Sequence, residues 1–132
     1  MKTMKKYILA VIALPALFSC ATSKTEQKIV QLNPTEEETI VSLNVGQTVQ
    51  IEAEKNPSTG YNWHLEVPSD CSVTYIKEDS KSIYNDGRVG APIIGIYEFS
   101  ASSVGECIVE FDYSRGWEGK SNQPKKVKFI VK

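Results

Sequence analysis

Histidine is nearly absent from this sequence, and so are the residue patterns on which most catalytic and metal sites depend. The 132 residues include one histidine, His64, and contain no Cys-x-x-Cys pair, no Gly-x-Ser-x-Gly segment and no phosphate-binding loop. His64 alternates with apolar residues along the segment 61–67, so we expect its ring to face solvent and not to activate a cysteine nucleophile. These absences argue against an enzyme, and they predict neither a metal ion nor another cofactor.

Clustered positive charge is also missing. The chain has 15 lysine and arginine residues against 16 aspartate and glutamate residues. Three of the lysines fall within the first 19 residues, so the remainder carries 12 basic and 16 acidic residues, a net charge of −4. Proteins that bind nucleic acid carry clustered basic residues, so this balance argues against a nucleic-acid partner. The length allows one domain and not two.

The first residues have the composition of an export signal. Three lysines precede the apolar run Tyr7–Leu17, which is shorter than the roughly 20 residues that a membrane-spanning helix needs. The run ends in the segment "LFSC", which resembles the bacterial lipobox, where cleavage before the cysteine accompanies attachment of a lipid to its sulfur. We therefore predict a signal peptide over residues 1–19 and lipidation of Cys20. The alternative is an ordinary secretory signal in which Cys20 has no role.

Lipidation would place the protein in the cell envelope. Residues 20–37 are then predicted to hold the lipidated cysteine and a polar tether, and Lys28–Leu32 fits an extra edge strand. Ala21 is not an acidic retention signal, which favours the outer membrane of a bacterium that has one. The folded domain is predicted over residues 38–132, as a monomer.

Two cysteines remain if Cys20 is lipidated. Cys71 and Cys107 form an even pair in an exported protein, which permits a disulfide that closes a loop of about 36 residues. They fit equally well as two buried thiols, each behaving as a small apolar residue. Both states stay open, because the sequence does not show whether the two Cβ atoms approach each other.

Alternation with a period of two dominates the rest of the chain. Turn residues separate the alternating segments, and helical periodicity is missing. This pattern predicts an all-β fold, an immunoglobulin-like antiparallel β-sandwich of seven or eight strands, with a small barrel as the alternative. The lysine-rich last segment is typical of a strand with one solvated face, such as an edge strand. The alternating segments are 39–43, 47–54, 61–67, 71–76, 94–100, 106–113 and 125–132.

Three connections carry residues that a simple turn does not need. The segment Asn56–Gly60 is polar but stiff, because Pro57 restricts its own φ and the conformation of the residue before it. The segment Asp86–Gly95 combines glycines with apolar residues, and Ser114–Gly119 places Trp117 between two glycines. We expect these three loops to gather at one end of the sandwich.

Each feature also has a plainer interpretation. Trp63 and Tyr61 fit core positions that hold the base of the first loop. Trp117 is either presented to solvent or folded back over the end of a sheet. Ile93 belongs either to a loop or to the next strand, and Arg115 either contacts a partner or is solvated.

The three loops resemble those of a known protein family. "NPSTGY" (Asn56–Tyr61), "RVGAPIIG" (Arg88–Gly95) and "YSRGWE" (Tyr113–Glu118) are similar, in order and spacing, to the loops of chagasin-type inhibitors of papain-like cysteine peptidases. The family pattern is Asn-Pro-Thr-Thr-Gly-Tyr, a glycine-containing loop, and Arg-Pro-Trp. Here serine replaces the first threonine, proline and isoleucine replace small residues of the middle loop, and Gly116 stands where proline is usual.

The resemblance implies an immunoglobulin-like sandwich and reversible, non-covalent inhibition. The first loop would lie over the catalytic cysteine of the peptidase, with Trp117 on the primed side and the middle loop on the non-primed side. The implied peptidase-binding residues are Asn56, Pro57, Ser58, Thr59, Gly60, Gly90, Ala91, Pro92, Ile93, Arg115, Gly116 and Trp117. Two other functions fit an apolar loop end: an adhesion or carbohydrate-binding envelope lipoprotein, and a structural component of the envelope.

Overall fold

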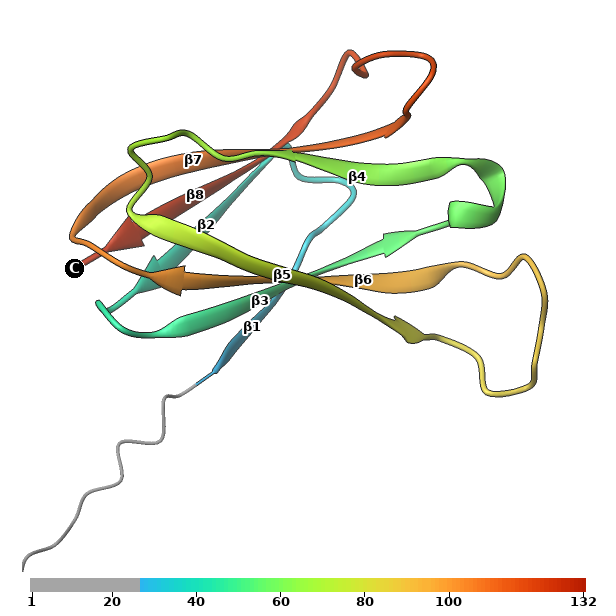
Figure 1. Ribbon diagram of the computed structural model, residues 1–132, viewed down its shortest axis with the longest axis horizontal. Helices are drawn as coiled ribbons and strands as arrows, with labels where there is room; N and C mark the ends of the chain where they lie inside the picture. Colours follow the sequence, from blue (N-terminus) through green and yellow to red (C-terminus); the bar gives the residue numbers. More distant parts are fainter. Residues whose placement is uncertain (1–26) are drawn as a thin grey trace, which may run out of the picture.

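The computed structural model describes residues 27–132 as two four-stranded β-sheets packed face to face (Figure 1). The expected signal peptide, the lipidation site Cys20 and residues 21–26 of the expected tether lie outside the described residues. Within those residues, no helix has the length and apolar character needed to cross a membrane. The first sheet has the order β1 (Lys28–Gln31), β3 (Thr48–Lys55), β6 (Ile93–Ala101), β5 (Val73–Ser82), and the second the order β2 (Glu38–Leu43), β8 (Lys125–Val131), β7 (Gly105–Arg115), β4 (Tyr61–Glu66).

Alternation along the strands builds the core, as predicted. Every second side chain of the central strands points between the sheets, where burial of apolar surface drives folding. In β6 the core face is the one that carries Tyr97 and Phe99. Phe99 packs against Phe129 of β8 with ring centroids 5.0 Å apart, so aromatic contacts join the two sheets. The prediction of an immunoglobulin-like sandwich with seven or eight strands is confirmed.

Two features of the topology differ from the prediction. The sheets are not wholly antiparallel, because β1 pairs with β3 and β2 pairs with β8 in parallel. The lysine-rich strand β8 is not at an edge but lies between β2 and β7. Its lysines mark the solvated outer face of the second sheet, where Lys128 Nζ lies 3.4 Å from a carboxylate oxygen of Glu106. One polar face therefore indicates an exposed side of a sheet and not an edge.

Strand β5 is longer than the alternating segment 71–76 predicted. It continues to Ser82 along an edge of the first sheet, with a register shift between Tyr75 and Lys77. Lysine side chains of this strand pair with carboxylates of the sheet: Lys81 Nζ lies 2.8 Å from an oxygen of Glu52. A charged edge with an irregular register discourages pairing with another chain.

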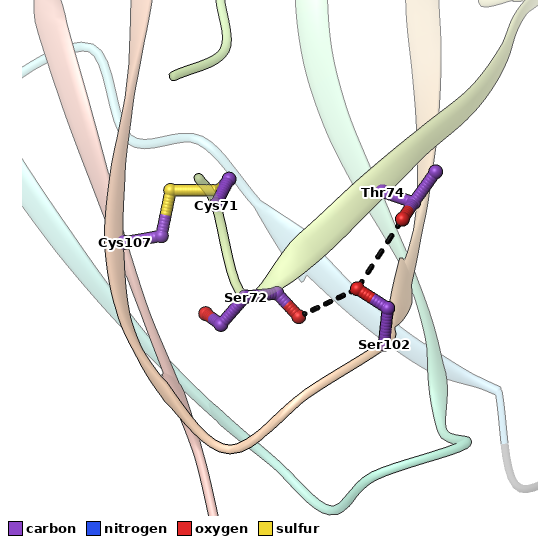
Figure 2. The surroundings of a disulfide bond; sticks show 5 residues. All are labelled: Cys71, Ser72, Thr74, Ser102 and Cys107. Carbon is purple, nitrogen blue, oxygen red and sulfur yellow. Dashed lines mark hydrogen bonds between the residues drawn. A yellow bond between two sulfur atoms is a disulfide. The ribbon is translucent and has the colours of Figure 1, made fainter. Parts of the chain in front are cut away.

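A disulfide between Cys71 and Cys107 joins the two sheets (Figure 2). Cys71 precedes β5 of the first sheet and Cys107 lies in β7 of the second, with Cα atoms 5.1 Å apart. Beside it, the Ser102 hydroxyl donates to the carbonyl of Ser72 at 3.1 Å. Of the two states that the sequence left open, the structure has the disulfide. We call this part of the sandwich the disulfide end.

Candidate functional site

The strand registers bring the three singled-out loops to the end of the sandwich opposite the disulfide (Figure 1). Lys55 at the end of β3 pairs with Ile93 at the start of β6, so the first loop (residues 56–60) starts beside the end of the second loop (83–92). Tyr61 at the start of β4 pairs with Arg115 at the end of β7, so the first loop ends beside the start of the third loop (116–124). We call this the loop end.

The first loop is stiff because its polar groups form hydrogen bonds with one another. Residues Pro57–Thr59 form a 3₁₀ turn, and Gly60 ends it with φ at +86°, a conformation that strongly favours glycine. The Asn56 carbonyl accepts hydrogen bonds from the amide of Thr59 at 3.2 Å and from its hydroxyl at 2.8 Å. The Ser58 hydroxyl donates to the side chain of Asn56 at 2.5 Å. Few torsions therefore remain free at the tip.

Aromatic rings support the base of the first loop. Tyr61 stacks on Tyr113 with centroids 5.3 Å apart, and Trp63 lies 4.8 Å from the same Tyr113 ring. The Tyr113 hydroxyl in turn accepts a hydrogen bond from the Asn56 amide at 3.0 Å. Trp63 packs against the core as predicted, but it stays half-buried at the rim, and its ring N–H donates to the carbonyl of Glu54 at 3.0 Å. The packed rings thus fix the position of the residues at the base of the first loop.

Arg115 ties the first loop to the third. Its guanidinium lies 4.5 Å from the centroid of the Tyr61 ring, and its Nε donates to the carbonyl of Thr59 at 3.1 Å. Its Nη1 lies 3.2 Å from a carboxylate oxygen of Glu118 in the third loop. Arg115 is therefore not merely solvated, because its side chain has partners in Tyr61, Thr59 and Glu118.

Trp117 is both exposed to solvent and packed against the end of the sandwich. The residue is 73% exposed, yet one edge of the indole lies on Gly60. A Cβ atom built on Gly60 would come within 2.3 Å of the Trp117 ring, so only glycine allows this approach. The ring therefore rests on the first loop and keeps most of its surface available to a partner.

The second loop has few ties to the other two. It contacts the first loop through a hydrogen bond of 3.4 Å from the Ser58 hydroxyl to the carbonyl of Gly90. Its tip is fastened internally, where the Arg88 side chain pairs with Asp86 and lies 4.6 Å from the Tyr84 ring centroid. Ala91 and Pro92 are half-buried, and Ile93 already belongs to β6. This settles the open alternative for Ile93 in favour of the strand.

Two polar groups at this end were missed by sequence reasoning. Lys55 lies before the first loop with a side chain only 8% exposed, and its Nζ is 2.6 Å from a carboxylate oxygen of Glu78. Asp112 is on the outer face of β7, where alternation predicts exposure, but the third loop covers it.

Val89 of the second loop is 100% exposed. Its sequence could have indicated this, because it is an apolar residue in a loop that contains several glycines.

Comparisons with known proteins agree with the geometry. The model of the chagasin family of peptidase inhibitors (I42) matches residues 42–132. Amoebiasin-2 of Entamoeba histolytica is 28% identical over 107 residues, 81% of this chain and 86% of that protein. The crystal structure of the cysteine protease inhibitor EhICP2 from Entamoeba histolytica superposes with a TM-score of 0.66 at 25% identity, over 80% of this chain and 97% of that one. The structure of PbICP-C in complex with falcipain-2 shares the fold, with a TM-score of 0.57 at 15% identity, over 79% and 97% of the two chains.

Proposed function

The chain belongs to the chagasin family of peptidase inhibitors, and we propose that its three loops enter the active-site cleft of a papain-like cysteine peptidase and block it reversibly, without a covalent bond. One observation carries this proposal: the first and third loops form a single preorganised edge, because Arg115 bonds to Thr59 and Trp117 rests on Gly60. A preordered edge loses little conformational entropy on docking, so more of the contact energy remains as affinity. The relatives give no support to an adhesion or carbohydrate-binding role.

Each loop has a place in this arrangement. Thr59, with Pro57, Ser58 and Gly60, lies over the catalytic cysteine of the peptidase, and Trp117 contacts the primed side of the cleft. The second loop contacts the non-primed side through residues 90–93, which the resemblance implies. We add Val89 to these residues, because it is fully exposed. An interface of standard size buries about 800 Å² on each partner, which three adjacent loops can supply.

The hydrogen bonds of the first loop explain how it would resist cleavage. A peptidase cuts a bond whose carbonyl oxygen can move into its oxyanion hole. The carbonyl of Asn56 already accepts bonds from Thr59, that of Pro57 accepts one from the Gly60 amide at 3.0 Å, and that of Thr59 accepts one from Arg115. Attack would have to break these internal bonds, so the loop stays intact in the cleft.

Titration of the protein against papain and cathepsin L-like enzymes tests the function. We expect inhibition, and we expect Thr59→Arg to raise the inhibition constant about 100-fold or more, because a long charged side chain keeps the loop out of the cleft. Ser103→Arg, an exposed serine at the disulfide end, is the matched control and leaves the constant unchanged. Failure of the unmodified protein to inhibit several such enzymes at micromolar concentration would sink the proposal.

We further propose that a lipid on Cys20 holds the protein, as a monomer, in the bacterial cell envelope, at the outer membrane where one exists. Strand β1 supports this arrangement, because its parallel pairing with β3 places Lys28 beside Val49, at the end of β3 that is far from the first loop. An anchor that precedes Lys28 would then leave the three loops turned away from the membrane. Cys20→Ser should abolish incorporation of labelled fatty acid. Equal labelling of both proteins would contradict the anchor.

A further inference from the structure

The sequence of the third loop does not by itself restrict the loop to one conformation. Trp117 needs a fixed position in order to bind, but glycine occupies residues 116 and 119 on either side of the Trp117–Glu118 pair. Glycine gives a chain more conformational freedom than any other residue, and Gly116 stands where the family pattern has a proline. A loop of this composition would lose much entropy on docking unless another contact orders it.

Asp112 makes such a contact. The residue is only 6% exposed, although it lies on the outer face of β7. Its two carboxylate oxygens accept hydrogen bonds from the Ser121 amide at 3.2 and 3.1 Å, and one of them also accepts a bond from the Ser121 hydroxyl. The Ser114 hydroxyl donates to the carboxylate at 3.0 Å. The return of the third loop is thus bonded to the strand from which the loop leaves.

The other end of the same loop is fixed by Arg115. The Glu118 amide donates to the Arg115 carbonyl at 3.0 Å, and the Arg115 side chain bonds to Thr59. Trp117 therefore lies between two fixed points, Arg115 and Ser121. At the second point, Asp112 accepts hydrogen bonds from both the amide and the hydroxyl of Ser121. The neighbouring Lys120 also pairs with Glu66 of β4, but both side chains of that pair are mostly exposed, so it holds the loop weakly.

The electrostatic setting keeps this carboxylate ionised. Burial by itself raises the pKa of Asp112, but the hydrogen bonds from Ser121 and Ser114 outweigh it, with help from His64, and the pKa falls below its usual value. A carboxylate with a lowered pKa keeps its hydrogen bonds at neutral pH and loses them only as the pH falls through that lowered value. The other titratable groups that line the cavity beside Asp112 are His64, Glu66, Glu110 and Lys120.

We propose that Asp112 is a positioning residue of the inhibitory site: its carboxylate fastens Ser121 and so holds the third loop in the conformation in which Trp117 rests on Gly60. In this chain the Asp112–Ser121 contact supplies the order that a proline at position 116 would otherwise give. The consequence for inhibition rests on the proposed function, whereas the contact itself can be measured in the free protein.

Limited digestion with trypsin, a serine peptidase, measures the contact without any cysteine peptidase. Trypsin cuts after Lys120, and the nitrogen of that peptide bond is the Ser121 amide that donates to Asp112. We expect Asp112→Asn and Ser121→Ala to be cut at this bond at least about tenfold faster than the unmodified protein, because a charged hydrogen bond that holds the loop is lost. Glu106→Gln makes the same charge change on the outer face of the same strand, but at the disulfide end, and leaves the cutting rate unchanged.

Inhibition constants then test the positioning role. Asp112→Asn should raise the constant about tenfold, and addition of Gly116→Pro should restore most of the loss, because proline restricts the loop directly. Proline fits there, since Arg115 is extended as the last residue of β7 and a Cβ at position 116 meets no atom within 4 Å. A merely structural role of Asp112 would lower the melting temperature without such a rescue.

Two outcomes overturn the proposal. One is an unchanged rate of cutting after Lys120 in both Asp112→Asn and Ser121→Ala, and the other is faster cutting with an unchanged inhibition constant. If the unmodified protein inhibits no cysteine peptidase, the proposed function fails, and the digestion comparison alone then decides whether Asp112 orders the loop.

Discussion

The two ends of this sandwich are held together in different ways. At the disulfide end a covalent bond joins the sheets, and the connections there are turns with little exposed aromatic surface. At the loop end the contacts are non-covalent. Arg115 to Thr59 and Trp117 to Gly60 join the first and third loops, and Asp112 to Ser121 ties the third loop to β7. The disulfide end therefore serves the stability of the fold, and the loop end serves the shape of the surface that we propose meets a peptidase.

This division has a physical reason. A disulfide acts mainly by restricting the unfolded chain, so it stabilises the domain wherever it lies. Contacts within an inhibitory surface must instead fix the folded shape, because disorder there lowers affinity. Changes at one end should consequently affect stability, and changes at the other should affect inhibition.

Removal of the disulfide should have the largest effect of all on the stability of the fold. Replacement of Cys71 and Cys107 by serine should lower the free energy of unfolding by about 3–4 kcal/mol, as expected for a closed loop of this length. Urea denaturation measures this loss, and inhibition measured well below the transition should stay within about threefold of the original. A large rise in the inhibition constant of the folded variant would break the division between the two ends.

Among changes to the contacts between the loops, Gly60→Ala should have the largest effect, a rise of roughly 100-fold in the inhibition constant. The new Cβ would strain a residue with positive φ and would push Trp117 off the first loop. Gly46→Ala is the matched control, because Gly46 also has positive φ, at +89°, but lies at the disulfide end with no atom within 4 Å of the added Cβ. Equal inhibition constants for the two variants would show that the Trp117 contact is unimportant.

Trp117→Ala should have the smallest of these effects, a loss of at least about 2 kcal/mol of binding energy, or roughly 30-fold in the inhibition constant. Val104→Ala provides the comparison, because Val104 is 72% exposed at the disulfide end, almost the same fraction as Trp117 at the loop end. Both variants should keep their melting temperatures. If Val104→Ala weakened inhibition as much, exposed apolar surface in general and not the loop end would carry the binding.

Much of the fold could be predicted from the sequence, because alternation in the strands is a local property. Segments such as 47–54 and 106–113 gave the core faces correctly, with Val49, Ile51 and Phe111 buried. The position of β8 and the two parallel pairs could not be predicted in this way. Pairing partners depend on residues far apart in the chain, and a strand with one polar face fits the centre of a half-solvated sheet as well as its edge.

The stiffness of the first loop was determined by the sequence itself, because Asn56, Pro57 and Gly60 act on torsions within a few residues. The composition of the other two loops was equally plain, and the resemblance to the inhibitor family followed from it. Only the tertiary structure decided that Arg115 is bonded to Thr59, that the Trp117 ring lies on Gly60 and that Asp112 is covered by the third loop. These contacts require strands from different parts of the chain to end side by side, and no local pattern of residues encodes that meeting.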